Sequence, residues 1–460
     1  MRLFLILSSF LLISFESFAK KITVEDVKKS ALTHYPLILS KYEMINVAKG
    51  DYLASKGIFD IRLKQEYQDY TRGYYDGKLS NTSIENQTRV LGAKIYAGYR
   101  KSYGDFAQYD GNYNTANSGE IYSGISVPLL KNRSTDQNRI NEILAKLDVE
   151  ESEIYLLDIK NKILRDATKA YWQVLVATKN YQIYQDLYNL SLNRQKQLQE
   201  QLSKGGIAEI ILVENEKNLI DREIQLLEAQ RDLNNSLIYL SLFYRLENGK
   251  PAIATQEDFA MEDFEVSEIN LNLNQDKIKK ALLQRPEIKL LDIKKKSAKV
   301  NLDYSKNLAQ PDLNLDFISS KDLGSGPDRL TQSNNLVKLN FSIPLQFSEA
   351  KGKIATNNSK IRKINFEKQI TQDKILYEIS QLANNVNNAV LTYNNYKKQV
   401  NLAKKLEEAE RNKFNHGHSD FFLVNLREQQ TANSKIKKMK TLEEYQKNLA
   451  DYKAAIFEML

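Results

Sequence analysis

The stretch KFNHGHSDFFLVNLRE (413–428) holds a single glycine, Gly417, between a polar helical run and an apolar cluster. A matching stretch, QLSKGGIAEIILVENE (201–216), lies earlier in the chain and places Gly205 in similar surroundings. Glycine adopts a positive φ at little cost, and helices commonly end at such a residue. We therefore expect each stretch to form a tight turn between two antiparallel helices.

The segments around these turns favour unusually long helices. All seven prolines avoid residues 129–250 and 345–460, and a proline inside a helix costs about 3 kcal/mol. One continuous buried face, with an average spacing of about 3.6 residues per turn, is predicted from a series of residues three or four apart. These residues are Ile163, Ala167, Tyr171, Val174, Thr178, Tyr181, Gln185, Tyr188 and Leu192. A helix over 137–203 would be about 100 Å long at about 1.5 Å per residue. Such a helix does not fit a compact globule.

The sequence is internally duplicated, because several landmarks occur twice in the same order. ALTHYP (31–36) matches ALLQRP (281–286), and GISVPLL (124–130) matches NFSIPLQ (340–346). The long helical runs and the two glycine stretches follow in each half. The expected organisation is a signal peptide at 1–19, a first repeat at 20–246 (strands 57–128, helical hairpin 136–246), a linker at 247–273 and a second repeat at 274–460 (strands 312–344, helical hairpin 349–460).

The first 19 residues have the features of a secretory signal peptide. An early positive charge precedes a short apolar core, and the small residues Ser17 and Ala19 stand at a suitable offset for cleavage. A membrane anchor is a weaker interpretation because the core is short and Glu16 ends it. A lipid anchor on cysteine is excluded, since the chain contains no cysteine. Export would leave either a soluble periplasmic or secreted protein or an outer-membrane β-barrel.

The composition argues against several classes of protein. The net charge of +8 comes from 66 basic and 58 acidic residues spread along the chain, which indicates solvated helices rather than a nucleic-acid-binding arm. After residue 19 no apolar run approaches the roughly 20 residues of a membrane-spanning helix. We find no nucleophile–histidine–acid grouping, phosphate-binding glycine loop or carboxylate cluster. We therefore expect no enzyme activity, no cofactor and no nucleic-acid partner.

The strand regions alternate apolar and polar residues, as in FDIRLKQEY (59–67) and PDLNLDFIS (311–319). Such strands suit the lipid-facing wall of a barrel, although a tyrosine-rich soluble sheet is the alternative. The expected strands are 57–70, 119–128, 312–320 and 335–344. Four strands cannot close, and an open edge cannot sit in lipid, so the barrel must be shared between copies. Residues 89–113 look like a further strand pair, an extended outer loop or a segment folded back inside.

These features together resemble the TolC family of outer-membrane efflux proteins over about 22–460. The resemblance rests on the signal peptide, the repeat, the strand endings SVPL (126–129) and SIPL (342–345), and the turn of the form [YF]-x-x-G at 414–417. It implies a mainly α, internally duplicated homotrimer with long helical hairpins in a periplasmic α-barrel tunnel. It also implies a shared outer-membrane β-barrel of twelve strands, four from each chain.

The resemblance implies a passive exit duct in the outer membrane of a Gram-negative type of envelope. Such ducts dock onto a periplasmic adaptor, itself bound to an inner-membrane pump, in drug efflux, metal efflux or type I secretion. Neither the cargo nor the pump is indicated by the sequence. The rival interpretation is a soluble periplasmic coiled-coil scaffold or adaptor with a small β-domain, which would be extracted from cells without detergent.

The resemblance also assigns roles to individual residues. The adaptor-docking turns would be Lys204, Gly205, Gly206, Ile207, His416, Gly417, His418 and Ser419, and the strand-to-helix junctions would be Pro128 and Pro344. The periplasmic aperture would be lined by Asp420, Leu423, Leu426 and Arg427.

The aperture departs from the family pattern. Acidic residues often stand six and nine positions after the second glycine in this family, where this chain has Leu423 and Leu426. We therefore expect a leucine constriction that excludes water, rather than an acidic ring. His416 and His418 lack a third ligand nearby in sequence, so we expect a solvent-facing turn rather than a metal site.

Overall fold

The computed structural model describes residues 21–107, 113–259, 266, 271, 275–330 and 332–460. The expected signal peptide lies outside the described residues. The chain divides into two compact units, residues 1–39, 159–278 and 377–460 on the one hand and residues 40–158 and 279–376 on the other. Each unit therefore draws on both sequence repeats. Among the described residues, no helix is both long and apolar enough to traverse a membrane.

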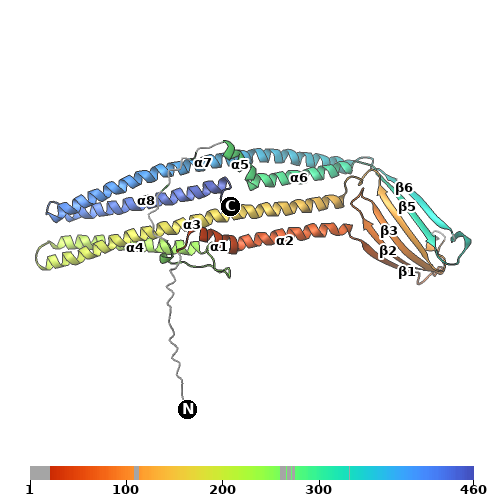
Figure 1. Ribbon diagram of the computed structural model, residues 1–460, viewed down its shortest axis with the longest axis horizontal. Helices are drawn as coiled ribbons and strands as arrows, with labels where there is room; N and C mark the ends of the chain where they lie inside the picture. The colour runs from red at the N-terminus through yellow and green to blue at the C-terminus, as the bar shows by residue number, and fades with distance from the viewer. Residues whose placement is uncertain (1–20, 108–112, 260–265, 267–270, 272–274, 331) are drawn as a thin grey trace, which may run out of the picture. The chain divides into compact units, whose positions relative to one another are not determined.

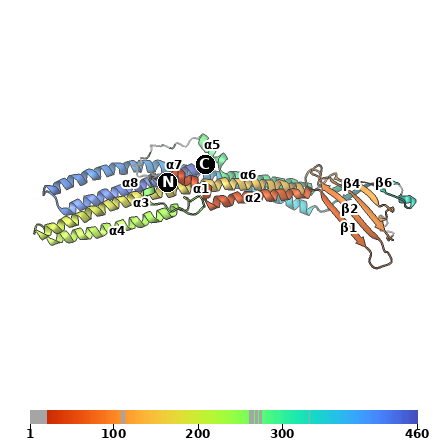
Figure 2. The same ribbon diagram turned by 60° about the horizontal axis from the view of Figure 1, so that its bottom comes forward.

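The first unit is helical. It contains α1 (Val24–His34), α4 (Glu209–Leu240), η3 (Gln256–Asp258), the start of α5 (Gln275–Gln284) and α8 (Phe421–Ala455). It also contains α3 (Gln137–Ser203) from residue 159 and α7 (Ser348–Asn415) from residue 377. Figures 1 and 2 both show α3 beside α4 and α7 beside α8, each pair joined by a short turn. The helix predicted at 137–203 is confirmed by α3.

The buried face of α3 differs in part from the predicted one. Val174 and Thr178 are completely buried, as expected, but Gln185 is exposed. Farther along, the buried residues keep to multiples of seven from Ile163, at Ala170, Ser191 and Leu198, with Ala177 and Tyr184 of the same series half-buried. A seven-residue repeat corresponds to 3.5 residues per turn, the value for helices that coil around each other. The predicted spacing of about 3.6 per turn therefore drifts off the contact line along so long a helix.

The repeated proline motifs explain how the shorter helices are divided. Tyr35, before Pro36, has ψ 120°, and Arg285, before Pro286, has ψ 125°. A residue before proline disfavours the helical conformation, so α1 and α5 each end just before this residue. The proline then begins the next helix. The helices that follow are α2 (Pro36–Lys56) and α6 (Pro286–Asn307).

The second unit contains one antiparallel sheet with the helical segments attached to it. The strands are β1 (Arg62–Asp69), β2 (Lys78–Gln87), β3 (Lys94–Tyr103), β4 (Glu120–Pro128), β5 (Asp312–Asp322) and β6 (Ser333–Ser342). They pair in the order β1-β2-β3-β4-β5-β6, so that each strand neighbours the next in sequence. Figure 1 shows them as a continuous row. The short helices η1 (Gly57–Phe59) and η4 (Asp328–Leu330) precede β1 and β6.

The expectation of four strands per chain is wrong, because the sheet has six. β1, β4, β5 and β6 correspond to the expected strands, and β2 and β3 form an additional hairpin between β1 and β4. The segment 89–113 supplies only β3 within its described part, since residues 108–112 lie outside it. Its partner β2 lies earlier, and its sequence KLSNTSIENQ places Leu79 and Ile84 on opposite faces. β2 therefore lacks the alternation that identified the other strands.

The segment between the repeats is only partly described. It contains η3, and Ile22 pairs with Phe259 in an isolated parallel bridge within the first unit. Most of residues 260–273 lie outside the described part, so the predicted linker at 247–273 stays a prediction.

Candidate functional site at the helical turns

The two predicted turns have the same backbone geometry. Gly205 has φ +73° and Gly417 has φ +78°. In the first turn Gly205 N–H donates to the Leu202 carbonyl at 2.8 Å, and Gly206 N–H donates to the Gln201 carbonyl at 2.9 Å. This pair of bonds is the Schellman ending of a helix.

The second turn repeats this pattern. Gly417 N–H donates to the Phe414 carbonyl at 3.0 Å, and His418 N–H donates to the Lys413 carbonyl at 2.8 Å. A positive φ costs a non-glycine residue about 1–2 kcal/mol, which explains why glycine stands at both positions. The side chains around the glycines are mostly exposed, with Ile207 and Ser419 half-buried.

The residues after the second turn begin α8. The Asp420 carboxylate accepts a hydrogen bond from Leu423 N–H at 2.8 Å and so caps the helix. Leu426 is 39% exposed, whereas Leu423 and Arg427 are half-buried. Asp420 therefore stabilises a helix end, and of the two leucines predicted to line the aperture, Leu426 is the more exposed in the single chain.

The histidines of the turn form no ligand cluster within the described residues. His416 Nδ1 lies 2.7 Å from the Asn412 carbonyl oxygen, which suits a local helix-end contact. Across the described part of the chain there is no group of three or more His, Cys, Asp or Glu side chains that could hold a metal ion.

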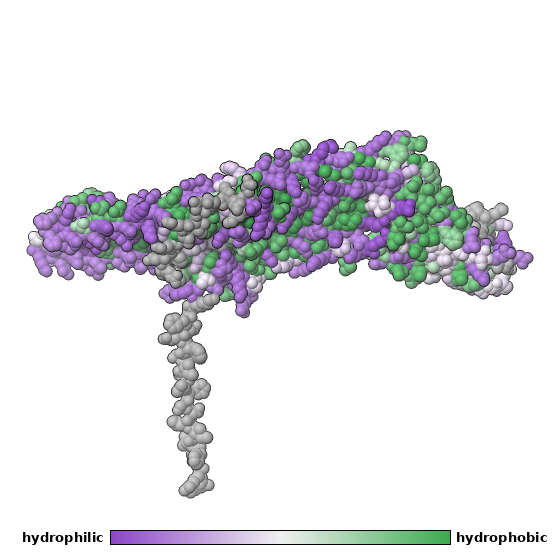
Figure 3. Space-filling model, turned by 45° about the horizontal axis from the view of Figure 1, so that its top comes forward, coloured by the Kyte–Doolittle hydropathy of each residue, from purple (hydrophilic) through white to green (hydrophobic). Residues whose placement is uncertain are grey.

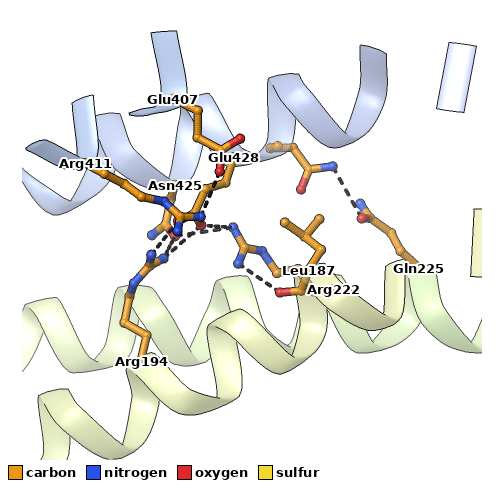
Figure 4. Close-up of polar contacts among 9 residues, drawn as sticks. Leu187, Arg194, Arg222, Gln225, Glu407, Arg411, Asn425 and Glu428 are labelled. Atoms are coloured by element: carbon orange, nitrogen blue, oxygen red, sulfur yellow. Dashed lines mark hydrogen bonds and ion pairs between the residues drawn. The ribbon is translucent and has the colours of Figure 1, made fainter. Parts of the chain in front are cut away.

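A buried charge cluster lies behind the two turns. Glu428 on α8 is 1% exposed and contacts three arginines, Arg194 on α3, Arg222 on α4 and Arg411 on α7 (Figure 4). Arg194 stands eleven residues before Gly205, and Glu428 stands eleven residues after Gly417. At about 1.5 Å per residue, the cluster is roughly 16 Å from the turns. It joins all four helices that lead into them.

The cluster is bound by short contacts. Arg194 holds Glu428 through two donors, at 2.5 and 3.0 Å, in a bidentate pair. Arg222 Nη2 reaches the same carboxylate at 3.1 Å, and Arg411 Nη2 lies 3.2 Å from it. Asn425 Oδ1 accepts from Arg194 at 2.7 Å, one turn before Glu428. Bidentate and charge-assisted contacts of this kind are the stronger hydrogen bonds in proteins.

The charges in the cluster are not balanced. Three arginines share Glu428, and within the described part of the chain only Arg411 has a further carboxylate, Glu407, at 2.8 Å. Among the described residues, Nε of Arg411 and Nδ2 of Asn425 are buried without a hydrogen-bond partner. The cluster therefore has more donors than acceptors, which makes Glu428 the acceptor on which it depends.

The protonation of the cluster follows from this arrangement. Burial alone would raise the pKa of Glu428. The hydrogen bond and charge of Arg194, together with the charges of Arg222 and Arg411, outweigh burial and hold the pKa of Glu428 below its ordinary value. Burial lowers the pKa of Arg222 against the opposing attraction of Glu428.

The sequence alone does not indicate this cluster, because its members come from four helices. One signal was present: Glu428 follows Phe421, Val424 and Asn425 on the buried face of α8. A carboxylate on such a face is seldom buried without a cationic partner.

Comparison with solved structures identifies the fold. The CmeC outer membrane channel of Campylobacter jejuni has a TM-score of 0.65 and 15% identity, with 95% of this chain and 86% of that chain covered. The outer membrane protein VceC of Vibrio cholerae has a TM-score of 0.63 and 13% identity, with 94% and 95% covered. The open state of the MtrE outer membrane channel of Neisseria gonorrhoeae has a TM-score of 0.65 and 12% identity, with 94% and 88% covered.

The chain has the fold of the TolC-like outer-membrane channels. The likeness covers 94–95% of this chain and therefore extends over both repeats. Neither the protein-family models nor the curated proteins include a match to this sequence. At these identities the comparison establishes the fold, and the resemblance read from the sequence motifs agrees with it.

Proposed function

We propose that three copies of this chain form a passive exit duct in the outer membrane. Cargo would enter from an inner-membrane pump through a periplasmic adaptor. The observation that carries the proposal is the likeness to outer-membrane channels over 94–95% of the chain. A likeness confined to the helices would also suit a soluble scaffold, but the uncovered part of this chain is shorter than the six strands together.

The surface of the single chain supports assembly with further copies. β1 and β6 are edge strands, and every residue of β6 is exposed. Figure 3 shows hydrophobic side chains gathered over part of the sheet. α4 also carries an exposed apolar stripe, formed by Ile210, Val213, Ile220, Ile224 and Leu227. Open edges and apolar stripes of this kind require partners, and copies of the same chain supply them.

Under this proposal the turns are the docking elements for the adaptor. Because the chain has no cysteine, a cysteine introduced at Lys204 or His418 should be the only crosslinking site. Each variant should crosslink to the adaptor in cells, whereas Glu216→Cys, an exposed site on α4, should do so much less. Equal crosslinking at all three positions would contradict docking through the turns.

We further propose that Leu423 and Leu426 form the narrowest, water-excluding part of the entrance. The wild-type channel in planar bilayers should then be insensitive to micromolar trivalent cations. Leu426→Asp would place three carboxylates around the pore and should create such a block. Strong block of the wild-type channel would instead indicate an acidic ring.

Cell fractionation tests the proposal as a whole. The duct predicts heat-modifiable trimers that are extracted from the outer membrane only with detergent. A folded monomer released without detergent would contradict the duct and favour the soluble scaffold.

A further inference from the structure

The extra hairpin β2–β3 has the features of a full part of the barrel wall rather than of a loop. Its strands contain ten residues each, as many as β6. The turn between them returns to the helical end of the sheet, where Arg89 forms a bidentate pair with Glu142 of α3 at 2.9 and 3.2 Å. Asn86 also donates to the Phe59 carbonyl just before β1, at 2.6 Å. The hairpin therefore extends over the whole height of its neighbours.

The hairpin also shares the apolar face of the sheet. Partners in a registered antiparallel sheet point to the same face, and one such row joins Ile95, Ile125, Phe317 and Val337 on β3 to β6. A neighbouring row joins Leu63 of β1 to Ile84 of β2. Ile84 and Ile95 are about half exposed, at 50% and 49%, like the exposed apolar residues of the other strands. The hairpin thus carries the same apolar belt as the strands on either side.

On the polar face, side chains tie the hairpin to both neighbouring strands. Glu85 of β2 pairs with Lys64 of β1 at 2.6 Å and with Lys94 of β3 at 2.8 Å. Tyr122 of β4 donates to Asn81 of β2 at 2.8 Å, and its ring lies over Gly98 of β3, where a Cβ atom would clash with it. A segment folded back into a lumen could not make these registered contacts.

The two free edges are suited to each other. Every neighbouring pair is antiparallel, so the first and sixth strands run in opposite directions. Each has exposed apolar residues toward its helical end, Leu63 on β1 with Ile61 directly before the strand, and Leu339 and Phe341 on β6. β6 of one copy can therefore pair antiparallel with β1 of the next, with the apolar belt continuing across the junction.

The belt also crosses the strands obliquely. The residues Ile61 and Leu63 flank Arg62, the first residue of β1. The register leads from Arg62 through Glu85, Tyr96, Gly124 and Ile318 to Leu336 of β6. On β6 the apolar residues centre on Leu339 instead, three residues closer to the helical end. In a closed barrel the strands tilt relative to the axis, so a level belt must shift along successive strands in this way.

We propose that the outer-membrane wall contains eighteen strands, six from each of three copies, rather than twelve. This inference rests on the proposed trimeric duct. With strands about 4.8 Å apart and tilted by about 40°, a wall of twelve strands is roughly 24 Å across and one of eighteen roughly 36 Å. The extra hairpin therefore widens the barrel about 1.5-fold and places additional polar residues along the lumen.

Disulfide mapping in intact membranes tests the strand order. Gln65 of β1 is registered with Thr82 of β2, and the same row reaches Ile121 of β4. In the eighteen-stranded wall, Gln65→Cys/Thr82→Cys should form a disulfide. Gln65→Cys/Ile121→Cys should not, because the strands are roughly 14 Å apart and a disulfide needs Cα atoms within about 7 Å. Ile125→Cys/Phe317→Cys, across β4 and β5, is the positive control.

The outcomes separate this inference from the proposed function. A disulfide between positions 65 and 121, or none between 65 and 82 while the control pair forms, overturns the eighteen-stranded wall and leaves the duct intact. Pairs of cysteines with one on β1 and one on β6 should also give covalently linked trimers at some register. Monomers extracted without detergent would overturn the duct itself.

Discussion

Replacing Glu428 by glutamine should loosen the helices behind the turns far more than an ordinary surface change. The substitution keeps the shape of the side chain but removes the only carboxylate shared by Arg194, Arg222 and Arg411. Arg222 is 3% exposed, so its charge would stay buried without its carboxylate partner. Breaking a buried ion pair on one side typically costs about 3–5 kcal/mol.

Hydrogen exchange measures this effect locally, which suits an assembled membrane protein that does not unfold reversibly. A loss of about 3 kcal/mol corresponds to roughly 100-fold faster exchange, at about 1.36 kcal/mol for each factor of ten. The acceleration should appear in the amides of α8 after Phe421 and of α3 around Arg194. Glu444→Gln, at an exposed position of the same helix, is the matched control.

A second substitution separates the charge effect from lost packing. Arg222→Met should lower local stability less in the Glu428→Gln background than in the wild type, because the buried arginine has then already lost its carboxylate partner. Additive effects of the two substitutions, or exchange in Glu428→Gln no faster than in Glu444→Gln, would refute the view that the cluster joins the four helices.

Three further outcomes follow from the same region. Gly417→Ala should lower local stability by about 1–2 kcal/mol through its positive φ, whereas Gly206→Ala, where the backbone is not in that region, should have little effect on exchange near its turn. Asp420→Ala should destabilise the start of α8 by about 1 kcal/mol, because the helix loses its N-cap. Asp420→Asn should retain most of the capping stability, as measured by hydrogen exchange. The pKa of Glu428 is lowered in the folded state. Its contribution to stability is therefore complete above its unfolded pKa of about 4.3, and it is lost as the pH falls through the folded pKa. Amide protection near the cluster should therefore fall in acid in the wild type and change little in Glu428→Gln.

The long helices and their turns could be predicted because the signals are local. A proline-free run bounded by glycine specifies where a helix begins and ends, whatever lies beside it. The turn geometry at Gly205 and Gly417 follows from the same reasoning, since the Schellman bonds involve residues close in sequence.

The charge cluster could not be predicted in the same way. Arg194, Arg222 and Arg411 are separated by long stretches of helix, and each looks like an ordinary surface arginine in its own segment. Only the packing of four helices brings them to Glu428. The buried face of α3 shows the same limit, because its coiling against neighbours sets the 3.5-residue repeat that places Ser191 and Leu198 inside.

The additional hairpin could be predicted only in part, because β3 lies in the segment 89–113 that resembled a strand pair, whereas β2 lacks an alternating pattern. Its position in the first repeat is physically constrained. Each strand reverses the direction of the chain. With one added strand, β4 would therefore finish at the end of the sheet that lies away from the helices, and α3 could not follow it directly. Two added strands restore the direction, and β4 still ends at Pro128, followed by α3 from Gln137. An insertion between β1 and β4 can therefore widen the sheet only by pairs of strands. The second repeat, which connects β5 directly to β6, retains the shorter arrangement.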